Sequence, residues 1–138
     1  MLAHVKAVQA LLTATGYGTA HLVFVAEKPT YPYWVLEPQF ASAHVEMPVC
    51  GLTDDLDLTF RVKSVALSSD SALTVAGFAQ TAIAPMGHQR RIAVPGRSVR
   101  VWHERREADY VETQVMNPDL DRPVAISVDT YRLVSTPA

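Results

Sequence analysis

The sequence predicts a single α+β domain, a mixed or antiparallel sheet packed by two helices in the order α-β-β-β-α-β-β. Three observations support this prediction. Two segments carry apolar residues at spacings of three and four, as amphipathic helices do. Other short segments alternate apolar with polar residues or are rich in β-branched side chains, as strands are. The 138 residues show no internal repeat or break in composition, which predicts one domain, residues 1–138.

The helices are predicted at residues 2–14 and 70–83. Thr15-Gly16 follows the first, and glycine adopts the left-handed conformation that ends a helix without steric cost. Ser68, Ser69 and Asp70 are candidate N-caps for the second, which Pro85 ends. The predicted apolar stripes are Leu2, Val5, Val8 and Leu12 in the first helix, and Ala72, Val75, Ala76, Ala79, Ala82 and Ile83 in the second.

Three strands are predicted between the helices, at residues 21–26, 33–38 and 56–63. The third has the clearest period of two, so its apolar members Leu58, Phe60 and Val62 should face the core. Its polar members Thr59, Arg61 and Lys63 should face outward or into a subunit contact. The alternation slips at Ser64, which indicates either a β-bulge or burial of both faces.

The second helix is followed by a predicted loop that includes Gly87 and Pro95-Gly96. Strands are then predicted at residues 98–104 and, less clearly, 110–115. A turn rich in Asp and Pro occupies residues 117–123, and a final strand covers 124–134. Residues 39–53 hold no period for long and are predicted to be an irregular excursion.

Composition excludes several classes of protein. The chain is 49% hydrophobic and 19% charged, as globular domains are. A formal net charge of −2 gives no global attraction to nucleic acid or membrane. No apolar run approaches the ~18 residues of a membrane span, and the N-terminal segment lacks the pattern of a signal peptide, so we expect no membrane partner. The single cysteine, Cys50, rules out an intrachain disulfide.

Catalytic and cofactor motifs are absent from the sequence. It contains no phosphate-binding P-loop, no dinucleotide-binding Gly-x-Gly-x-x-Gly and no Gly-x-Ser-x-Gly nucleophile elbow. Cys50 would be a nucleophile only if a histidine folded against it, and a small buried hydrophobe is the stronger interpretation. We therefore expect no enzyme activity, no catalytic residue and no cofactor.

Metal sites are also not expected. The segment His103-Glu104-Arg105-Arg106-Glu107 lacks the second histidine of the zinc motif His-Glu-x-x-His and is predicted to be strand. The other histidines are far apart in sequence. The run Asp54, Asp55 and Asp57 lacks the glycine and distal glutamate of an EF-hand loop, which favours a solvated loop or strand edge.

Charge is concentrated in one part of the chain. Residues 88–106 hold six arginines and one glutamate, a formal +5, which leaves −7 for the remainder. Three interpretations stay open: a solvated basic face, a surface for head-to-tail self-association against acidic clusters, or a nucleic-acid contact. The candidate interface or lumen residues are Arg90, Arg91, Arg97, Arg100, Arg105 and Arg106, with the acidic Asp54, Asp55, Asp57, Asp119 and Asp121.

Several segments, in their order and spacing, resemble the tail terminator (tail completion) proteins of long-tailed, non-contractile bacteriophages. No single one of them is a catalytic motif, and the likeness extends over nearly the whole chain. The segments are the N-terminal helix ending in Thr15-Gly16, Tyr31-Pro32-Tyr33-Trp34-Val35-Leu36, residues 57–65, Asp70 at the start of the second helix, Asp119-x-Asp121-Arg122-Pro123, and Ser127-Val128-Asp129-Thr130-Tyr131-Arg132-Leu133.

The resemblance implies a structural protein of the virion. Such proteins form a homo-oligomeric ring, typically a hexamer, that caps the tail tube, stops its polymerisation and provides the surface to which the head joins. The implied partners are other copies of the chain, the tail tube protein and a head–tail connector protein, with DNA passing through the lumen. The implied location is the head-proximal end of the tail, and the host cytoplasm during assembly.

Two other functions stay open. A head–tail connector or neck protein would share the size, the ring and the absence of catalytic motifs. A small-ligand-binding α+β domain would instead need a pocket with converging polar groups, and the sequence does not indicate one. The excursion over residues 41–52 and the arginine-rich segment are not features of the resemblance.

Overall fold

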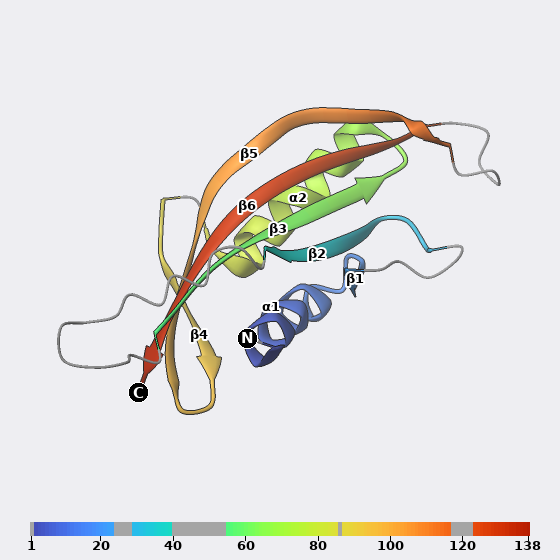
Figure 1. The fold of residues 1–138 in the computed structure, drawn as a ribbon. Helices are drawn as coiled ribbons and strands as arrows, with labels where there is room; N and C mark the ends of the chain where they lie inside the picture. The colour runs from blue at the N-terminus through green and yellow to red at the C-terminus, as the bar shows by residue number, and fades with distance from the viewer. Residues whose placement is uncertain (1, 24–28, 40–54, 86, 117–122) are drawn as a thin grey trace.

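A computed structural model describes residues 2–23, 29–39, 55–85, 87–116 and 123–138 (Figure 1). Within these described residues, two helices and six strands follow one another in the order α-β-β-β-α-β-β-β, so the predicted α+β class and element order are confirmed. The strands form one mixed sheet in the order β1-β2-β3-β6-β5-β4. The elements are α1 Leu2–Ala14, β1 Thr19–Leu22, β2 Tyr33–Gln39, β3 Leu56–Ala66, α2 Ser69–Ile83, β4 Arg90–Val94, β5 Arg97–Met116 and β6 Pro123–Pro137.

Both helices pack on the same face of the sheet, here called the helix-covered face, and β5 and β6 curve over α2 (Figure 1). β1 pairs with β2 in parallel and the other strand pairs are antiparallel. Alternate residues of the strands meet the helices in one continuous core. Among its buried side chains are Val8, Leu12, Val75 and Ile83 from the helices and Trp34, Leu36, Phe60, Val62, Val101, Tyr131 and Leu133 from the strands.

The helix bounds agree with the sequence prediction. α1 buries Val5, Val8 and Leu12, but Leu2, the other member of the predicted stripe, is 59% exposed at the start of the helix. Gly16 follows α1 with φ +74°, the left-handed conformation expected of its stop. Ser68 is the N-cap of α2, and its hydroxyl accepts a hydrogen bond from the Ser71 amide at 3.2 Å. The members of the α2 stripe are buried except Ala82, which is partly exposed.

The register predicted for β3 is also confirmed. Leu58, Phe60 and Val62 are 2%, 3% and 0% exposed, and Phe60 stacks on Tyr131 of β6 with ring centroids 5.4 Å apart. Because β3 pairs with β2 and β6 without a register shift, the slip at Ser64 is burial of both faces and not a bulge. A second apolar cluster on the other, helix-free face explains that burial: Tyr31, Tyr33, Val35, Val65, Val124 and Ile126.

Three strand predictions are corrected. β1 ends at Leu22, because Val23 has φ +66°; residues 24–26 of the predicted strand lie outside the described residues. The predicted loop before residue 98 contains a strand, β4, which forms a hairpin with β5 through the two-residue turn Pro95-Gly96. The two strands predicted at 98–104 and 110–115 are one strand, β5, with three irregularities in its pairing with β6.

Neither described helix is long and apolar enough to span a membrane.

Candidate functional site

The arginines of residues 88–106 do not form one patch. The β4–β5 hairpin alternates its side chains between the two faces of the sheet, and an extra residue at Glu104 resets the alternation. The register therefore places three arginines on each face. Arg90, Arg97 and Arg106 are on the helix-covered face, and Arg91, Arg100 and Arg105 are on the helix-free face.

On the helix-covered face, Arg90 and Arg97 fasten the hairpin to neighbouring elements. The Arg90 guanidinium donates to the backbone carbonyls of Thr81 and Ala82, near the C-terminal end of α2. A cation at this end satisfies orphan carbonyls and complements the helix dipole. Arg97 donates to the hydroxyl of Ser135 at 2.8 Å and to its carbonyl at 3.1 Å, and His4 of α1 bonds the same hydroxyl at 2.8 Å. These contacts bring β4, β5, β6 and both helices together.

Arg106 belongs to a polar cluster around the buried Asp129 of β6. Asp129 is fully buried, and its Oδ1 lies 2.8 Å from both Arg106 Nε and His103 Nε2. Arg106 also donates to Gln80 Oε1 of α2 at 3.1 Å. A buried carboxylate requires such partners, because an uncompensated charge in the core costs several kcal/mol. The cluster joins α2 to the two longest strands.

Three polar atoms of this cluster have no hydrogen-bond partner within the described part of the chain: Asp129 Oδ2, Gln80 Nε2 and the hydroxyl of Tyr131. Burial raises the pKa of Tyr131, and the negative charge of Asp129 raises it further, while Arg106 lowers it. The tyrosine is therefore a neutral phenol under ordinary conditions. His103, which lies in the incomplete His-Glu-x-x-His segment, has Asp129 as its partner. No three potential metal ligands converge among the described residues.

The helix-free face carries the other three arginines. Arg91 of β4 and Arg100 of β5 lie directly opposite one another in the register, and both are exposed. Neither has an ionic or hydrogen-bond partner among the residues that the structure describes. Arg105 is 3.8 Å from Glu107, and both side chains are exposed, so this pair contributes little. Like charges directly opposite on a sheet are destabilising, which makes Arg91 and Arg100 an energetic cost to the monomer.

Arg61, Lys63 and Arg132 also lie on the helix-free face, and each has an acidic partner. Glu37 of β2 pairs with Arg61 at 3.0 Å and with Lys63 at 2.9 Å, both on β3. Asp57 of β3 accepts two hydrogen bonds from Arg132 of β6, which also lies over the Trp102 ring at 5.5 Å. The hydrogen bond to Asp57, and then its charge, raise the pKa of Arg132.

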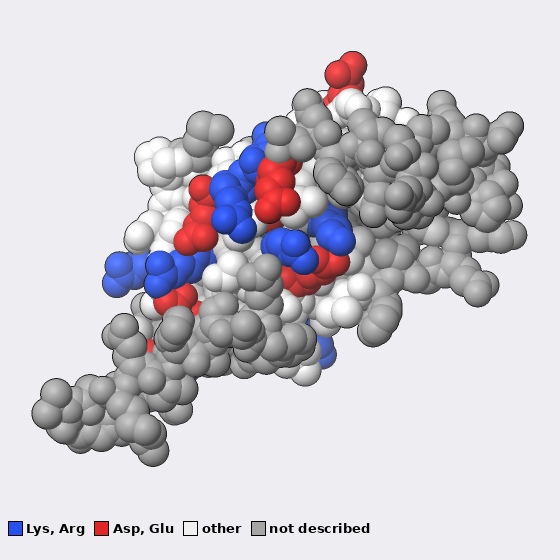
Figure 2. Space-filling view, turned by 45° about the horizontal axis from the view of Figure 1, so that its top comes forward, with Lys and Arg blue, Asp and Glu red and all other residues white. Residues whose placement is uncertain are grey.

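Of the five acidic residues expected to face the arginines, the structure describes Asp55 and Asp57. Asp57 lies in the same sheet as the arginines and is engaged within the chain, and Asp55 is exposed beside it. Asp54, Asp119 and Asp121 lie outside the described residues. Figure 2 shows basic and acidic side chains placed next to one another across one face of the molecule, not gathered into separate areas.

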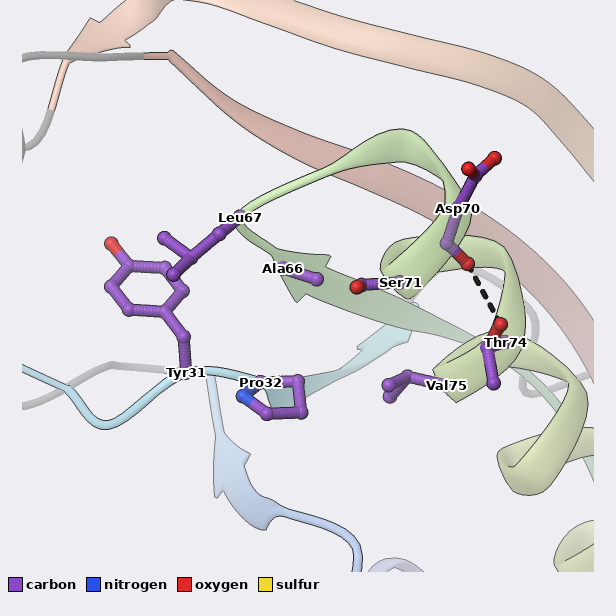
Figure 3. A pocket seen from close by; sticks show the side chains of 8 residues that line it. All are labelled: Tyr31, Pro32, Ala66, Leu67, Asp70, Ser71, Thr74 and Val75. Atoms are coloured by element: carbon purple, nitrogen blue, oxygen red, sulfur yellow. Dashed lines mark hydrogen bonds between the residues drawn. The ribbon is translucent and has the colours of Figure 1, made fainter.

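A cleft opens at the far end of the sheet, where β3 leads into α2 (Figure 3). Its volume is about 300 Å³, and its wall is mostly apolar. Tyr31 and Pro32 form one side and Val75 of α2 another, with Ala66 and Leu67 from the end of β3. Asp70, Ser71 and Thr74 of α2 form the polar rim.

The Asp70 side chain points away from the apolar wall of the cleft (Figure 3). It is exposed and has no partner among the described residues. Its own carbonyl accepts a hydrogen bond from Thr74 at 2.8 Å. The sequence indicates Asp70 as a candidate helix cap and as part of the resemblance, and Tyr31 and Pro32 as part of the resemblance alone. No periodicity indicates that these segments meet.

No protein-family model and no curated protein matches this chain.

Proposed function

We propose that this chain is a structural assembly protein that closes into a homo-oligomeric ring, as phage tail terminators do. In this role the ring, of about six subunits by the resemblance, caps the tail tube, ends its polymerisation and offers a surface for joining the head. It acts with the tail tube protein and a connector protein, at the head-proximal end of the tail.

The observation that carries the proposal is the exposed pair Arg91 and Arg100. Other arginines of the hairpin, such as Arg90, Arg97 and Arg106, have partners within the chain. The register holds this pair of like charges opposite one another, without an acid of the described chain to neutralise it. An acidic group on another molecule would turn that repulsion into attraction and would fix the orientation of the contact.

Two measurements test the proposal. Native mass spectrometry of the purified protein should show a closed oligomer of one size, and electron microscopy should show rings. Tail tubes assembled from tube protein without this chain should be of variable length, and adding it should stop their growth. A protein that stays monomeric at high concentration and with tail tubes, while tubes end normally in its absence, would contradict the ring and the terminator function together.

The cleft beside α2 favours a second candidate, a small-ligand-binding domain. A volume of about 300 Å³ lies at the lower end of the range for ligand pockets. A screen of small apolar and aromatic compounds by ligand-detected NMR tests this alternative. Saturable binding that perturbs the signals of Tyr31 and Val75, in a protein that stays monomeric, would favour it over the ring.

A further inference from the structure

We propose that the subunits of the ring join end to end: the β4–β5 hairpin of one copy docks at the α2 cleft of the next. In this contact Arg91 and Arg100 face Asp70, and Pro95 at the hairpin turn meets the apolar wall of the cleft. The inference rests on the proposed function, because it names the two surfaces that the ring would use.

The two surfaces lie at opposite ends of the molecule. The hairpin turn is at the end of the sheet where β3 begins and β6 finishes, since Arg97 is opposite Pro137 and Leu56 is opposite Ser135. The cleft is at the other end of β3, after an 11-residue strand. At about 3.3 Å per residue, this strand is roughly 35 Å long. A contact between unlike surfaces at opposite ends is heterologous, and repeating it generates a ring if the rotation closes.

Charge supports this pairing. Among the described residues, the two guanidinium groups of the hairpin have no acidic partner, and the Asp70 carboxylate at the rim of the cleft has no cationic partner. Arginine guanidinium groups form directed hydrogen bonds with carboxylates, which would set the register of the contact. The Asp70 side chain is exposed and points away from the cleft wall, so a neighbour can reach it without rearranging α2 (Figure 3).

Apolar surface is present on both sides. Pro95 is exposed at the hairpin turn, and the cleft offers Tyr31, Pro32, Leu67 and Val75. Such contacts supply affinity, whereas the charges supply orientation. Joining two copies edge to edge through their sheets is less favourable, because neither edge strand, β1 or β4, suits such pairing. β1 has only four residues and is followed by Val23 with φ +66°. β4 carries two arginines and is followed by Pro95. Short, charged and proline-flanked edges are those that resist pairing.

The test uses charge reversal on each surface of the full chain. One variant carries Arg91→Glu and Arg100→Glu, and a second carries Asp70→Arg. Each alone should fail to form rings, with its subunit affinity lowered about tenfold or more. Mixed in equal amounts, the two variants should form rings again. The glutamates on the hairpin of the first variant can then face Arg at position 70 of the second, and the native hairpin of the second can face the native Asp70 of the first. The mixed rings should contain the two variants in alternation, which native mass spectrometry resolves by mass.

A matched control for a single charge reversal carries Lys6→Glu, which reverses an exposed cation outside the proposed contact. It should form rings like the unmodified protein. Circular dichroism on all variants separates loss of assembly from loss of folding. A photo-crosslinking amino acid at position 95 gives independent evidence: its crosslinks should map to the peptides that contain residues 31–32 or 67–75 of another copy.

The outcomes separate this inference from the function it rests on. If the unmodified protein forms rings and the reversed variants form them equally well, the hairpin–cleft contact is wrong and the ring remains. If both variants fail but their mixture does not recover, the two surfaces are not partners. If the arginine variant forms rings but loses binding to a fluorescent DNA duplex, these arginines contact nucleic acid instead. If the unmodified protein never oligomerises, the ring itself is wrong.

Discussion

The two faces of the β4–β5 hairpin carry three arginines each, and the hairpin uses them differently. Those on the helix-covered face are bound to α2, to Ser135 and to Asp129, so they hold the hairpin to the rest of the domain. On the helix-free face, Arg91 and Arg100 repel one another and Arg105 has only a weak partner. Within one segment, the arginines of the helix-covered face therefore stabilise the fold, and those of the helix-free face are exposed to other molecules.

The two faces of the sheet also differ in their uncharged residues. The largest expected effect of that difference on stability is in β3. Phe60 faces the helices and stacks on Tyr131, whereas its neighbour Thr59 faces away and is partly exposed. Phe60→Ala should lower the free energy of unfolding by about 3–5 kcal/mol, because it leaves a cavity in the core. Thr59→Ala, the matched control, should change it by about 0.5 kcal/mol or less. Urea unfolding measures both, and equal effects would mean that the faces do not differ as described.

Removing the charge from Asp129 tests how much its contact with Arg106 stabilises the fold. Asp129→Asn should lower the free energy of unfolding by about 2–3 kcal/mol, since hydrogen bonds from Arg106 and His103 to a buried carboxylate are lost or weakened. The comparison is Glu107→Gln, which removes the exposed partner of Arg105 and should have almost no effect. Should the two substitutions cost the same, burial would not be what separates the two sets of arginines.

Tyr131 makes the helix-covered face sensitive to alkaline pH. Its pKa in the folded protein is raised by burial, whereas in the unfolded chain it is about 10. Above pH 10 the unfolded state therefore loses a proton that the folded state keeps, and stability falls by up to about 1.4 kcal/mol per pH unit. Tyr131→Phe should reduce this dependence, and should cost little at pH 7 because the hydroxyl has no partner among the described residues. Urea unfolding at pH 7 and at alkaline pH measures the loss of stability in both proteins. If the free energy of unfolding falls as steeply with pH in the variant as in the unmodified protein, Tyr131 is not the group responsible.

These differences between faces were only partly predictable from the sequence. The alternation of β3 indicates which side chains are buried, because Leu58 and Phe60 recur with a period of two. β4 was missed because Arg90, Arg91 and the following Pro95-Gly96 are more typical of a loop, and at an edge only one partner strand stabilises it.

The partners of the arginines could not be predicted, since they depend on tertiary contacts. Arg106 meets Asp129 across 23 residues of sequence, and the extra residue at Glu104 reverses which arginines face inward. The approach of Tyr31 and Pro32 to α2, which makes the cleft, likewise leaves no local signal. Local patterns therefore predicted both helices, most of the strands and much of the core, whereas the candidate site depends on the strand register, which they do not predict.

The smallest expected effect has the opposite sign from the others. Arg100→Thr removes one of two like charges held opposite each other and introduces a residue that favours strands, so it should raise the free energy of unfolding of the monomer by about 0.2–1 kcal/mol. Salt screens the repulsion between exposed charges, so the gain should be larger at ~0.01 M than at ~1 M salt. The same substitution should weaken self-association, because the proposed contact loses a cation. Urea unfolding of dilute protein and sedimentation of concentrated protein measure the two effects separately. If the variant is less stable at every salt concentration, Arg100 stabilises the monomer, and its exposed charge would no longer indicate an external partner.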